Sequence, residues 1–152
     1  RTNPFLKEIK GDFVIPLTYR GMVEAGEHID KKYELLGLNQ IYLDYAGCFP
    51  QTHPIHGHLA ELGTGQCVFF YQNNSIIEIH DRGGNCLARL SSEGASKWQK
   101  GLDHILEVRV LAMLRRNRDD PDENFQKKIR ADNWELPVLE VVSPARAGGF
   151  NR

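Results

Sequence analysis

The groups best suited to acid–base or metal chemistry are concentrated in one short segment. Three of the chain's six histidines fall within six residues, close to a thiol and a carboxylate. The groups concerned are Cys48, His53, His56, His58 and Glu61. Histidine titrates near neutral pH and is the commonest protein ligand of transition metals, so this segment is the first candidate for a functional site.

The local backbone decides whether these histidines can meet. One arrangement is a helix that runs from Thr52 as its cap to Leu62. Along such a helix His53 and His56 are neighbours, whereas His58 lies on nearly the opposite side. An extended or loop backbone would instead put His56 and His58 on one face, because side chains alternate along a strand.

Three interpretations of the segment remain open. In the first, the histidines lie in a polar loop or cap a helix and are purely structural. In the second, they bind a divalent metal such as zinc, with further ligands drawn from Glu61, Cys48 or His80. In the third, the same groups exchange protons without a metal.

The metal interpretation predicts a metal-dependent hydrolase, with a nuclease as one form of it. The bound cation would activate a water molecule, and a carboxylate would accept the proton of that water. The metal ligands would be His53, His56 and His58, and the catalytic residues would be Glu61 and His80.

A three-stranded antiparallel meander is predicted between residues 66 and 90. A two-residue turn at residues 73–74 would put Phe70 opposite Ile77 and Val68 opposite Ile79. The face formed by these residues is wholly apolar, which favours this pairing.

A second tight turn, at residues 83–84, would bring a third strand onto the second. Its register puts Ile79 opposite Ala88 and Glu78 opposite Arg89. The core face therefore stays apolar, and the one charged pair is complementary. This agreement makes the meander the centre of the predicted fold.

The opposite face of the meander is mixed and carries more aromatic residues than a solvated face would. We expect another segment or a partner to cover part of it. In this register His80 lies opposite Cys67, and a thiol beside an imidazole is the minimum for an activated nucleophile. A partly buried cysteine beside a satisfied histidine is the structural alternative. The residues of this face are Cys67, Phe69, Tyr71, Ile76, Glu78, His80, Leu87 and Arg89.

The longest helix is predicted over residues 93–116, where Trp98, Leu102, Ile105 and Met113 recur at helical spacing. Strands clustered together with helices around them predict a single α+β domain over residues 1–152. The other expected segments are an arm over 1–20, a helix over 26–36, a strand over 41–45, a shorter helix from 119 to 134, a strand over 136–142 and a loose tail over 143–152.

Composition bounds the class of protein. The chain has 152 residues, of which 41% are hydrophobic and 26% charged, as in ordinary folded domains. Its three cysteines cannot all pair, which fits a reducing compartment and predicts a cytoplasmic protein. No apolar run approaches the roughly 18–20 residues that span a bilayer, so we expect no membrane partner.

A net charge of −1 argues against non-specific binding to nucleic acid. Because residues 115–130 form a local basic segment, contact with nucleic acid remains one alternative. The structural explanation is that cations at helix C-termini interact favourably with the helix dipole. Its basic residues are Arg115, Arg116, Arg118, Lys127, Lys128 and Arg130.

The sequence favours a small binding or regulatory module over an enzyme, because no complete catalytic set can be assembled. The expected partner is a protein, which would contact the mixed sheet face or the helical region, and a homo-oligomer is an alternative. The other two hypotheses are a hydrolase that uses a divalent metal such as zinc and an accessory protein that contacts nucleic acid.

Overall fold

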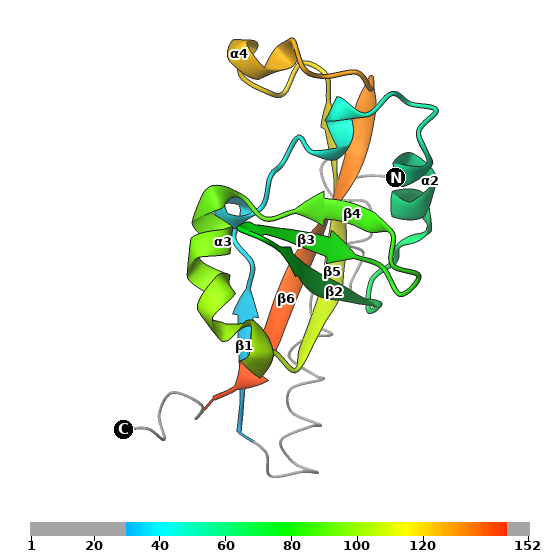
Figure 1. Ribbon diagram of the computed structural model, residues 1–152. Coiled ribbons are helices and arrows are strands. Elements are labelled where there is room, and N and C mark those ends of the chain that lie inside the picture. The colour runs from blue at the N-terminus through cyan, green and yellow to red at the C-terminus, as the bar shows by residue number, and fades with distance from the viewer. Residues whose placement is uncertain (1–29, 146–152) are drawn as a thin grey trace.

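The chain folds as a single α+β domain with an antiparallel meander, as the sequence predicts, and the meander is part of one six-stranded antiparallel sheet. The computed structural model describes residues 30–145, and the predicted arm over residues 1–20 lies outside them. The strands are β1 (Lys31–Leu35), β2 (Cys67–Asn73), β3 (Ile76–His80), β4 (Cys86–Arg89), β5 (Glu107–Asn117) and β6 (Asn133–Pro144). They stand in the order β1-β6-β5-β2-β3-β4, and β2 to β4 cross the two long strands at a steep angle (Figure 1).

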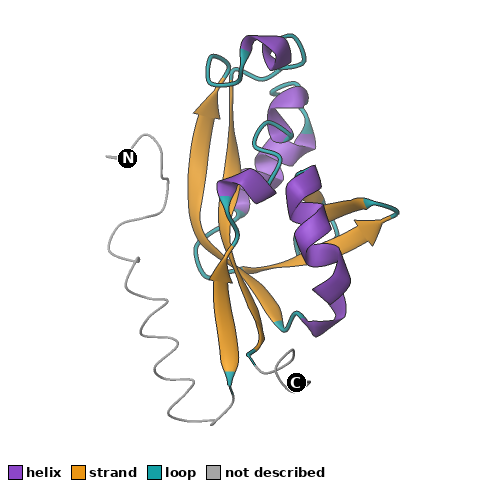
Figure 2. Cartoon of the chain, turned by 90° about the vertical axis from the view of Figure 1, so that its left-hand side faces the viewer, coloured by secondary structure: helices purple, strands orange, loops and turns teal. Residues whose placement is uncertain are grey.

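The helices are short and lie on one side of the long strands (Figure 2). They are η2 (Leu38–Gln40), η3 (Ala46–Cys48), α2 (Pro54–Glu61), α3 (Ser92–Trp98), η4 (Gln99–His104) and α4 (Glu123–Gln126), where η marks 3-10 helices. The helix η4 continues directly from α3. No helix within residues 30–145 has the length and apolar character that crossing a bilayer requires.

The predicted helix over residues 93–116 is wrong beyond His104. Its first part is α3 and η4, but the chain from Glu107 onward forms β5 and pairs with β6. Apolar residues are nearly continuous between 105 and 114, so they fit a helix as well as a strand, and pairing with β6 decides between them. Val108 and Val110 are buried, as β-branched residues in strands commonly are.

The helix predicted over residues 26–36 is also wrong where the structure describes it. Residues from Lys31 to Leu35 form β1, an edge strand that pairs with the end of β6. Lys31 lies opposite Pro144, so β6 continues past residue 143, where the loose tail was expected to begin. Lysine, glutamate and leucine favour a helix, but propensity is a weak prior, and here the hydrogen bonds to β6 outweigh it.

Two further predictions fail around Trp134. The strand expected over residues 41–45 is a single bridge from Ile41 to Leu90. The helix expected to reach residue 134 is only α4, which ends at Gln126, and the N–H groups of residues 130 and 131 donate to the carbonyl oxygen of Gly47. A Cβ atom on Gly47 would lie 2.8 Å from ring atoms of Trp134. This close packing holds both segments in irregular conformations.

The meander of β2, β3 and β4 is confirmed, but its first register is shifted by two residues. Phe70 lies opposite Ile79 rather than Ile77, because the turn consists of Asn74 and Ser75. Asn74 has a φ of 60°, a left-handed conformation that asparagine tolerates. A shift of two residues keeps every side chain on its own face, so the predicted apolar face survives.

The pairing of β3 with β4 has the predicted register, with Glu78 opposite Arg89 and Ile79 opposite Ala88. Ile79 belongs to the main hydrophobic core, which also includes Leu59 of α2 and Trp98 of α3. The core therefore ties the meander to both helices and holds the outer face of β3 and β4 in place.

Candidate functional site

Three side chains that can bind a metal meet on β3 and β4. Glu78, His80 and Cys86 each offer a ligand atom, and these atoms lie within 4.8 Å of one another. His80 Nε2 and Glu78 Oε1 are 2.8 Å apart, which is a hydrogen bond. All three side chains are half-buried. We call these three residues the β3–β4 cluster.

A β-bulge brings Cys86 into this cluster. The pairing of β3 with β4 shifts after Ile79, which lies opposite Ala88. His80 then lies opposite Cys86, so Leu87 is the extra residue. Leu87 and Ala88 are both buried, with exposed fractions of 0% and 3%. The bulge thus turns Leu87 into the core and leaves Cys86 beside His80, and the prediction that Leu87 lies on the mixed face is wrong.

Aromatic and basic side chains surround the cluster. The Tyr45 hydroxyl oxygen lies 3.5 Å from Cys86 Sγ. The guanidinium carbon of Arg89 lies 5.0 Å from the centre of the Tyr45 ring. The Tyr71 ring stacks on the imidazole of His80, with centroids 4.9 Å apart and planes inclined by 20°. These contacts orient the side chains that carry the ligand atoms.

The thiol of Cys86 is held in its protonated form. Burial has the largest effect on the pKa of this thiol and raises it. The hydrogen bond with Tyr45 lowers the pKa, whereas the charge of Glu78 raises it further. Burial also raises the pKa of Tyr45 above its ordinary value, so the phenol keeps its proton. The thiol lies 3.5 Å from the carbonyl oxygen of Ala88, to which it donates. A metal ion that binds here must displace this proton.

The histidine segment, residues 53–61, forms α2, as the helical interpretation predicts. The cap is His53 rather than Thr52, because His53 Nδ1 accepts a hydrogen bond from the backbone N–H two residues on, at 3.0 Å. The His53 ring also packs on Phe49, with centroids 4.6 Å apart. His56 Nε2 donates to the Phe49 carbonyl oxygen at 3.0 Å. Both imidazoles therefore secure the start of α2.

His58 and Glu61 lie elsewhere. They line a cleft of about 430 Å³ together with Asp81 and Arg82. The three histidines predicted as metal ligands are thus divided between two places on α2. Within residues 30–145, the group of three ligating side chains whose atoms gather within 4.8 Å is the β3–β4 cluster, which shares only His80 with the predicted set.

The predicted pairing of His80 with Cys67 is wrong. His80 lies opposite Phe69, as the two-residue shift requires. Cys67 Sγ instead lies 3.4 Å from Glu107 Oε2. Burial and this carboxylate raise the pKa of the Cys67 thiol, which is the opposite of what an activated nucleophile needs. The thiol beside His80 is that of Cys86.

Three of the four arginines of the basic segment are engaged with carboxylates. Their ion pairs are Arg115 with Glu135, Arg116 with Asp44 and Arg118 with Asp132, at 3.5, 2.8 and 3.6 Å. Lys127, Lys128 and Arg130 are exposed. Three of the six predicted cations are therefore already paired within the fold.

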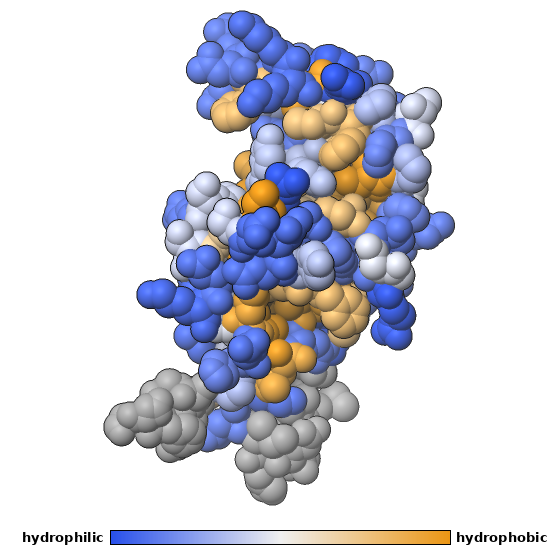
Figure 3. Space-filling view, in the orientation of Figure 1, coloured by the Kyte–Doolittle hydropathy of each residue, from blue (hydrophilic) through white to orange (hydrophobic). Residues whose placement is uncertain are grey.

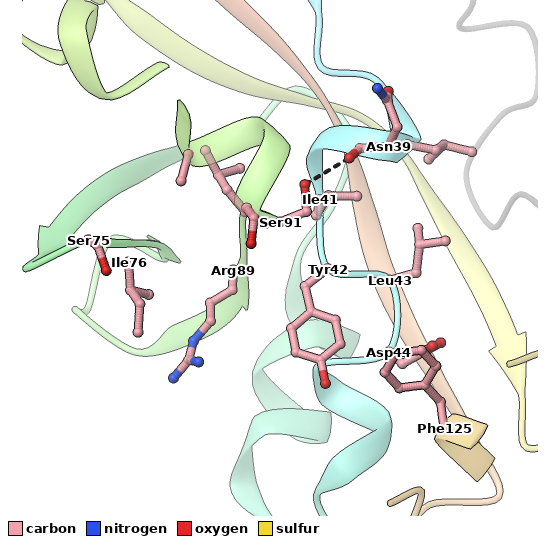
Figure 4. Close-up of a pocket in the computed structure, with 14 residues that line it drawn as sticks. Asn39, Ile41, Tyr42, Leu43, Asp44, Ser75, Ile76, Arg89, Ser91 and Phe125 are labelled. Atoms are coloured by element: carbon pink, nitrogen blue, oxygen red, sulfur yellow. Dashed lines mark hydrogen bonds between the residues drawn. The ribbon is translucent and has the colours of Figure 1, made fainter. Parts of the chain in front are cut away.

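A cleft of about 540 Å³ opens beside β4. Tyr42 and Arg89 project into it, and Asp44 and Phe125 lie across from them (Figure 4). The buried Arg89 Nε atom has no hydrogen-bond partner among the residues that the structure describes. Asp44, the one acidic residue among the described lining, is held by Arg116. The carboxylate of Asp44 is therefore already engaged in an ion pair within the fold.

A third hollow, of about 510 Å³, is largely apolar and lies where β2 separates from β5. We call it the β2 groove, and its apolar lining includes Val68, Phe69, Phe70, Leu102, Ile105 and Leu106. In the lower half of the view in Figure 3, hydrophobic side chains gather at the surface with hydrophilic side chains around them. Leu106 and Phe69 are 55% and 48% exposed. The groove is thus an apolar surface open to solvent.

The chain matches no protein-family model, no curated protein and no solved structure. The β2 groove and the β3–β4 cluster are therefore the features of the chain that bear on its function. The sequence places Glu78 and His80 on one face but gives no indication that Cys86 joins them, because a bulge leaves no mark in the alternation of side chains.

Proposed function

We propose that this protein is a binding module that takes an extended segment of a partner protein against β2. The observation that carries the proposal is an open strand edge beside an apolar groove. β2 pairs with β5 only at Cys67 and Val68. From Phe69 to Asn73, no strand within residues 30–145 pairs with that edge.

The backbone at this edge can accept another strand. The carbonyl oxygen of Gln66 accepts from the N–H of Val110 at 2.9 Å, which identifies the side of β2 that faces β5. Backbone groups alternate in direction along an antiparallel strand, so those of Phe70 and Gln72 face the same side. An added strand would gain main-chain hydrogen bonds at these two residues.

The side chains beside this edge define the chemistry of the bound segment. Phe69, Phe70 and Leu106 line the β2 groove, and Tyr71, which shares a face of β2 with Phe69, lies outside the groove lining and is 53% exposed. A segment with apolar side chains at alternate positions would fill the groove with one set of them. Aromatic side chains such as Phe69 and Tyr71 are enriched in protein interfaces, which supports a protein partner.

A library of linear peptides displayed on phage and selected against the full chain provides the probe. The affinity of a selected peptide would be measured by fluorescence anisotropy. Leu106→Asp puts a charge into the groove, and we expect it to weaken binding at least about tenfold. Leu38→Asp is the matched control, because Leu38 is similarly exposed, at 50%, but lies outside the groove; it should bind like the wild type.

A second pair of variants tests the strand edge. Gln72→Pro removes an N–H group from the open edge and should abolish binding, whereas Gln72→Ala keeps that group and should not. Failure of the library to yield a binder, or a binder indifferent to both Leu106→Asp and Gln72→Pro, would overturn the proposal. Self-association of the wild type that Gln72→Pro abolishes would also overturn it, in favour of a second copy of this chain.

The two alternative functions have less support. Contact with nucleic acid would use arginines of which Arg115, Arg116 and Arg118 already bind carboxylates. Metal-dependent hydrolysis at the histidine segment needs ligands that converge, but His53 and His56 bind Phe49 while His58 lines another cleft.

A further inference from the structure

We propose that Glu78, His80 and Cys86 form a binding site for zinc or a similar divalent transition metal. The proposal goes beyond the peptide-binding function and does not depend on it. A thiolate, an imidazole and a carboxylate are the three ligand types that zinc takes in proteins. A thiolate in the set favours zinc over magnesium or calcium, which prefer oxygen ligands alone.

The distances within the β3–β4 cluster suit one metal ion. Metal–ligand bonds of about 2.0–2.3 Å place tetrahedral ligand atoms about 3.3–3.8 Å from one another. The three ligand atoms lie within 4.8 Å of one another, and His80 Nε2 and Glu78 Oε1 lie at 2.8 Å. Small side-chain rotations therefore suffice to move from the hydrogen-bonded arrangement to a coordinating one.

The ligands are held by rigid elements. Glu78 and His80 stand two residues apart on one face of β3, and the bulge in β4 presents Cys86 to the same face. The stacked ring of Tyr71 fixes the plane of the His80 imidazole. A site on paired strands is better preorganised than a site on loops, so little ordering is needed when the metal binds.

Tyr45 is the outer-sphere partner of the site. Its hydroxyl lies 3.5 Å from Cys86 Sγ, and because the phenol keeps its proton it can donate to a thiolate there. Hydrogen bonds of this kind orient metal ligands and tune their basicity. Arg89 lies over the Tyr45 ring, where its charge favours the thiolate without occupying a ligand position.

The charges of the bound state balance. A divalent cation with one thiolate and one carboxylate carries no net charge, which lowers the cost of holding it in a half-buried site. The proton of the Cys86 thiol leaves to solvent when the metal binds, and His80 takes the tautomer with its proton on Nδ1, which frees Nε2 for the metal. Three protein ligands leave a fourth tetrahedral position for water or a donor atom of another molecule.

Titration of the reduced full chain with Co²⁺ tests the proposal directly. Cobalt substitutes for zinc, and a cobalt–thiolate bond gives a charge-transfer band in the near ultraviolet that oxygen and nitrogen ligands do not give. We expect this band at one cobalt per chain, and we expect Zn²⁺ to displace the cobalt and abolish the band. Absence of the band in the wild type would overturn the proposal.

Matched cysteine variants locate the site. Cys86→Ser should lose the band and weaken Zn²⁺ binding at least about tenfold, and His80→Gln and Glu78→Gln should also weaken it. Cys48→Ser and Cys67→Ser change the other two thiols and should keep the band. Circular dichroism of each variant in the presence of chelator confirms that it folds. Loss of the band in Cys48→Ser or Cys67→Ser, with the band retained in Cys86→Ser, would overturn the assignment.

The outer-sphere role of Tyr45 has its own control. Tyr45→Phe should lower the Zn²⁺ affinity by about tenfold. Tyr42→Phe removes a hydroxyl that lies 3.8 Å from a different thiol, that of Cys48, and should leave the affinity unchanged. Because peptide selection can be run in chelator, failure of the metal site and failure of the peptide site would be separate results.

Discussion

The histidine segment and the β3–β4 cluster differ in how the chain brings potential ligand groups together. The histidine segment is dense in ligand groups along the sequence, but a helix directs successive side chains around its axis and disperses them. The β3–β4 cluster draws on residues separated by a turn, and its members share one face of two paired strands. Density along the chain is therefore a poor guide to convergence in space.

The two regions also differ in what their polar groups do. His53 caps α2 and His56 binds the Phe49 carbonyl oxygen, so both imidazoles have structural partners. In the β3–β4 cluster, the ligand atoms of Glu78, His80 and Cys86 face one another. Variants should accordingly separate the regions: changes in α2 should alter stability alone, and changes in the cluster should alter metal binding.

The largest expected effect concerns the bulge that builds the cluster. Leu87→Ala should lower the free energy of unfolding by about 2–5 kcal/mol, because Leu87 is fully buried and its removal leaves a cavity. The measurement is urea unfolding followed by circular dichroism. Ile76→Ala is the control, since Ile76 is a comparably large side chain on the outer face, 37% exposed, and should cost clearly less. Equal small losses in both variants would mean that Leu87 lies outside, as simple alternation predicts.

Asp81, in the turn between His80 and Cys86, gives the next largest effect. One Asp81 carboxylate oxygen accepts from the backbone N–H of Asn85 at 2.9 Å, and the Asn85 side chain donates to both oxygens. Asp81→Ala should cost about 1–2 kcal/mol at neutral pH, because Asp81 is only partly buried and hydrogen bonds to exposed charges are worth less than buried ones. Asp103→Ala, which changes an exposed carboxylate elsewhere, should cost little.

The loss at Asp81 should depend on pH in a defined direction. Burial acts to raise the pKa of Asp81, but the hydrogen bonds from Asn85 and Gly83 outweigh it and hold the pKa below the ordinary value of 3.8. A carboxyl group with a lowered pKa in the folded state stabilises the fold fully above its ordinary pKa and loses that contribution as the pH falls through the lowered one. The difference between wild type and Asp81→Ala should therefore shrink in acid, and a constant difference would contradict this cause.

The sequence predicts the meander well and the cluster only in part. Alternation of apolar residues identifies β2, β3 and β4, and an error of two residues in the register of Phe70 leaves every face unchanged. An error of one residue exchanges the faces, and the bulge makes such a change at Leu87, which is why Cys86 could not be assigned. Residues 107–114 show the other limit, because a nearly continuous apolar run fits a helix until its partner β6 is known.

The histidines that secure α2 should have smaller effects. His53→Ala removes the cap of α2 and His56→Ala removes the bond to the Phe49 carbonyl, and each should cost about 1 kcal/mol. His53→Asn should restore most of the stability, since asparagine is a good helix cap. Both alanine variants should bind Zn²⁺ as the wild type does. A loss of Zn²⁺ affinity in either would show that α2 supplies a ligand after all.

The smallest expected effect is that of His58→Ala. His58 lines an open cleft near Asp81, so its removal should change the free energy of unfolding by no more than about 0.5 kcal/mol. It should also leave the Zn²⁺ affinity unchanged, because His58 is not a member of the β3–β4 cluster. His58 belongs to the densest group of potential ligands in the sequence, so this variant tests whether density along the chain predicts metal binding. Unchanged stability together with lost Zn²⁺ binding would place the metal at the mouth of this cleft, with Glu61 and Asp81, and would reverse the roles assigned to the two regions.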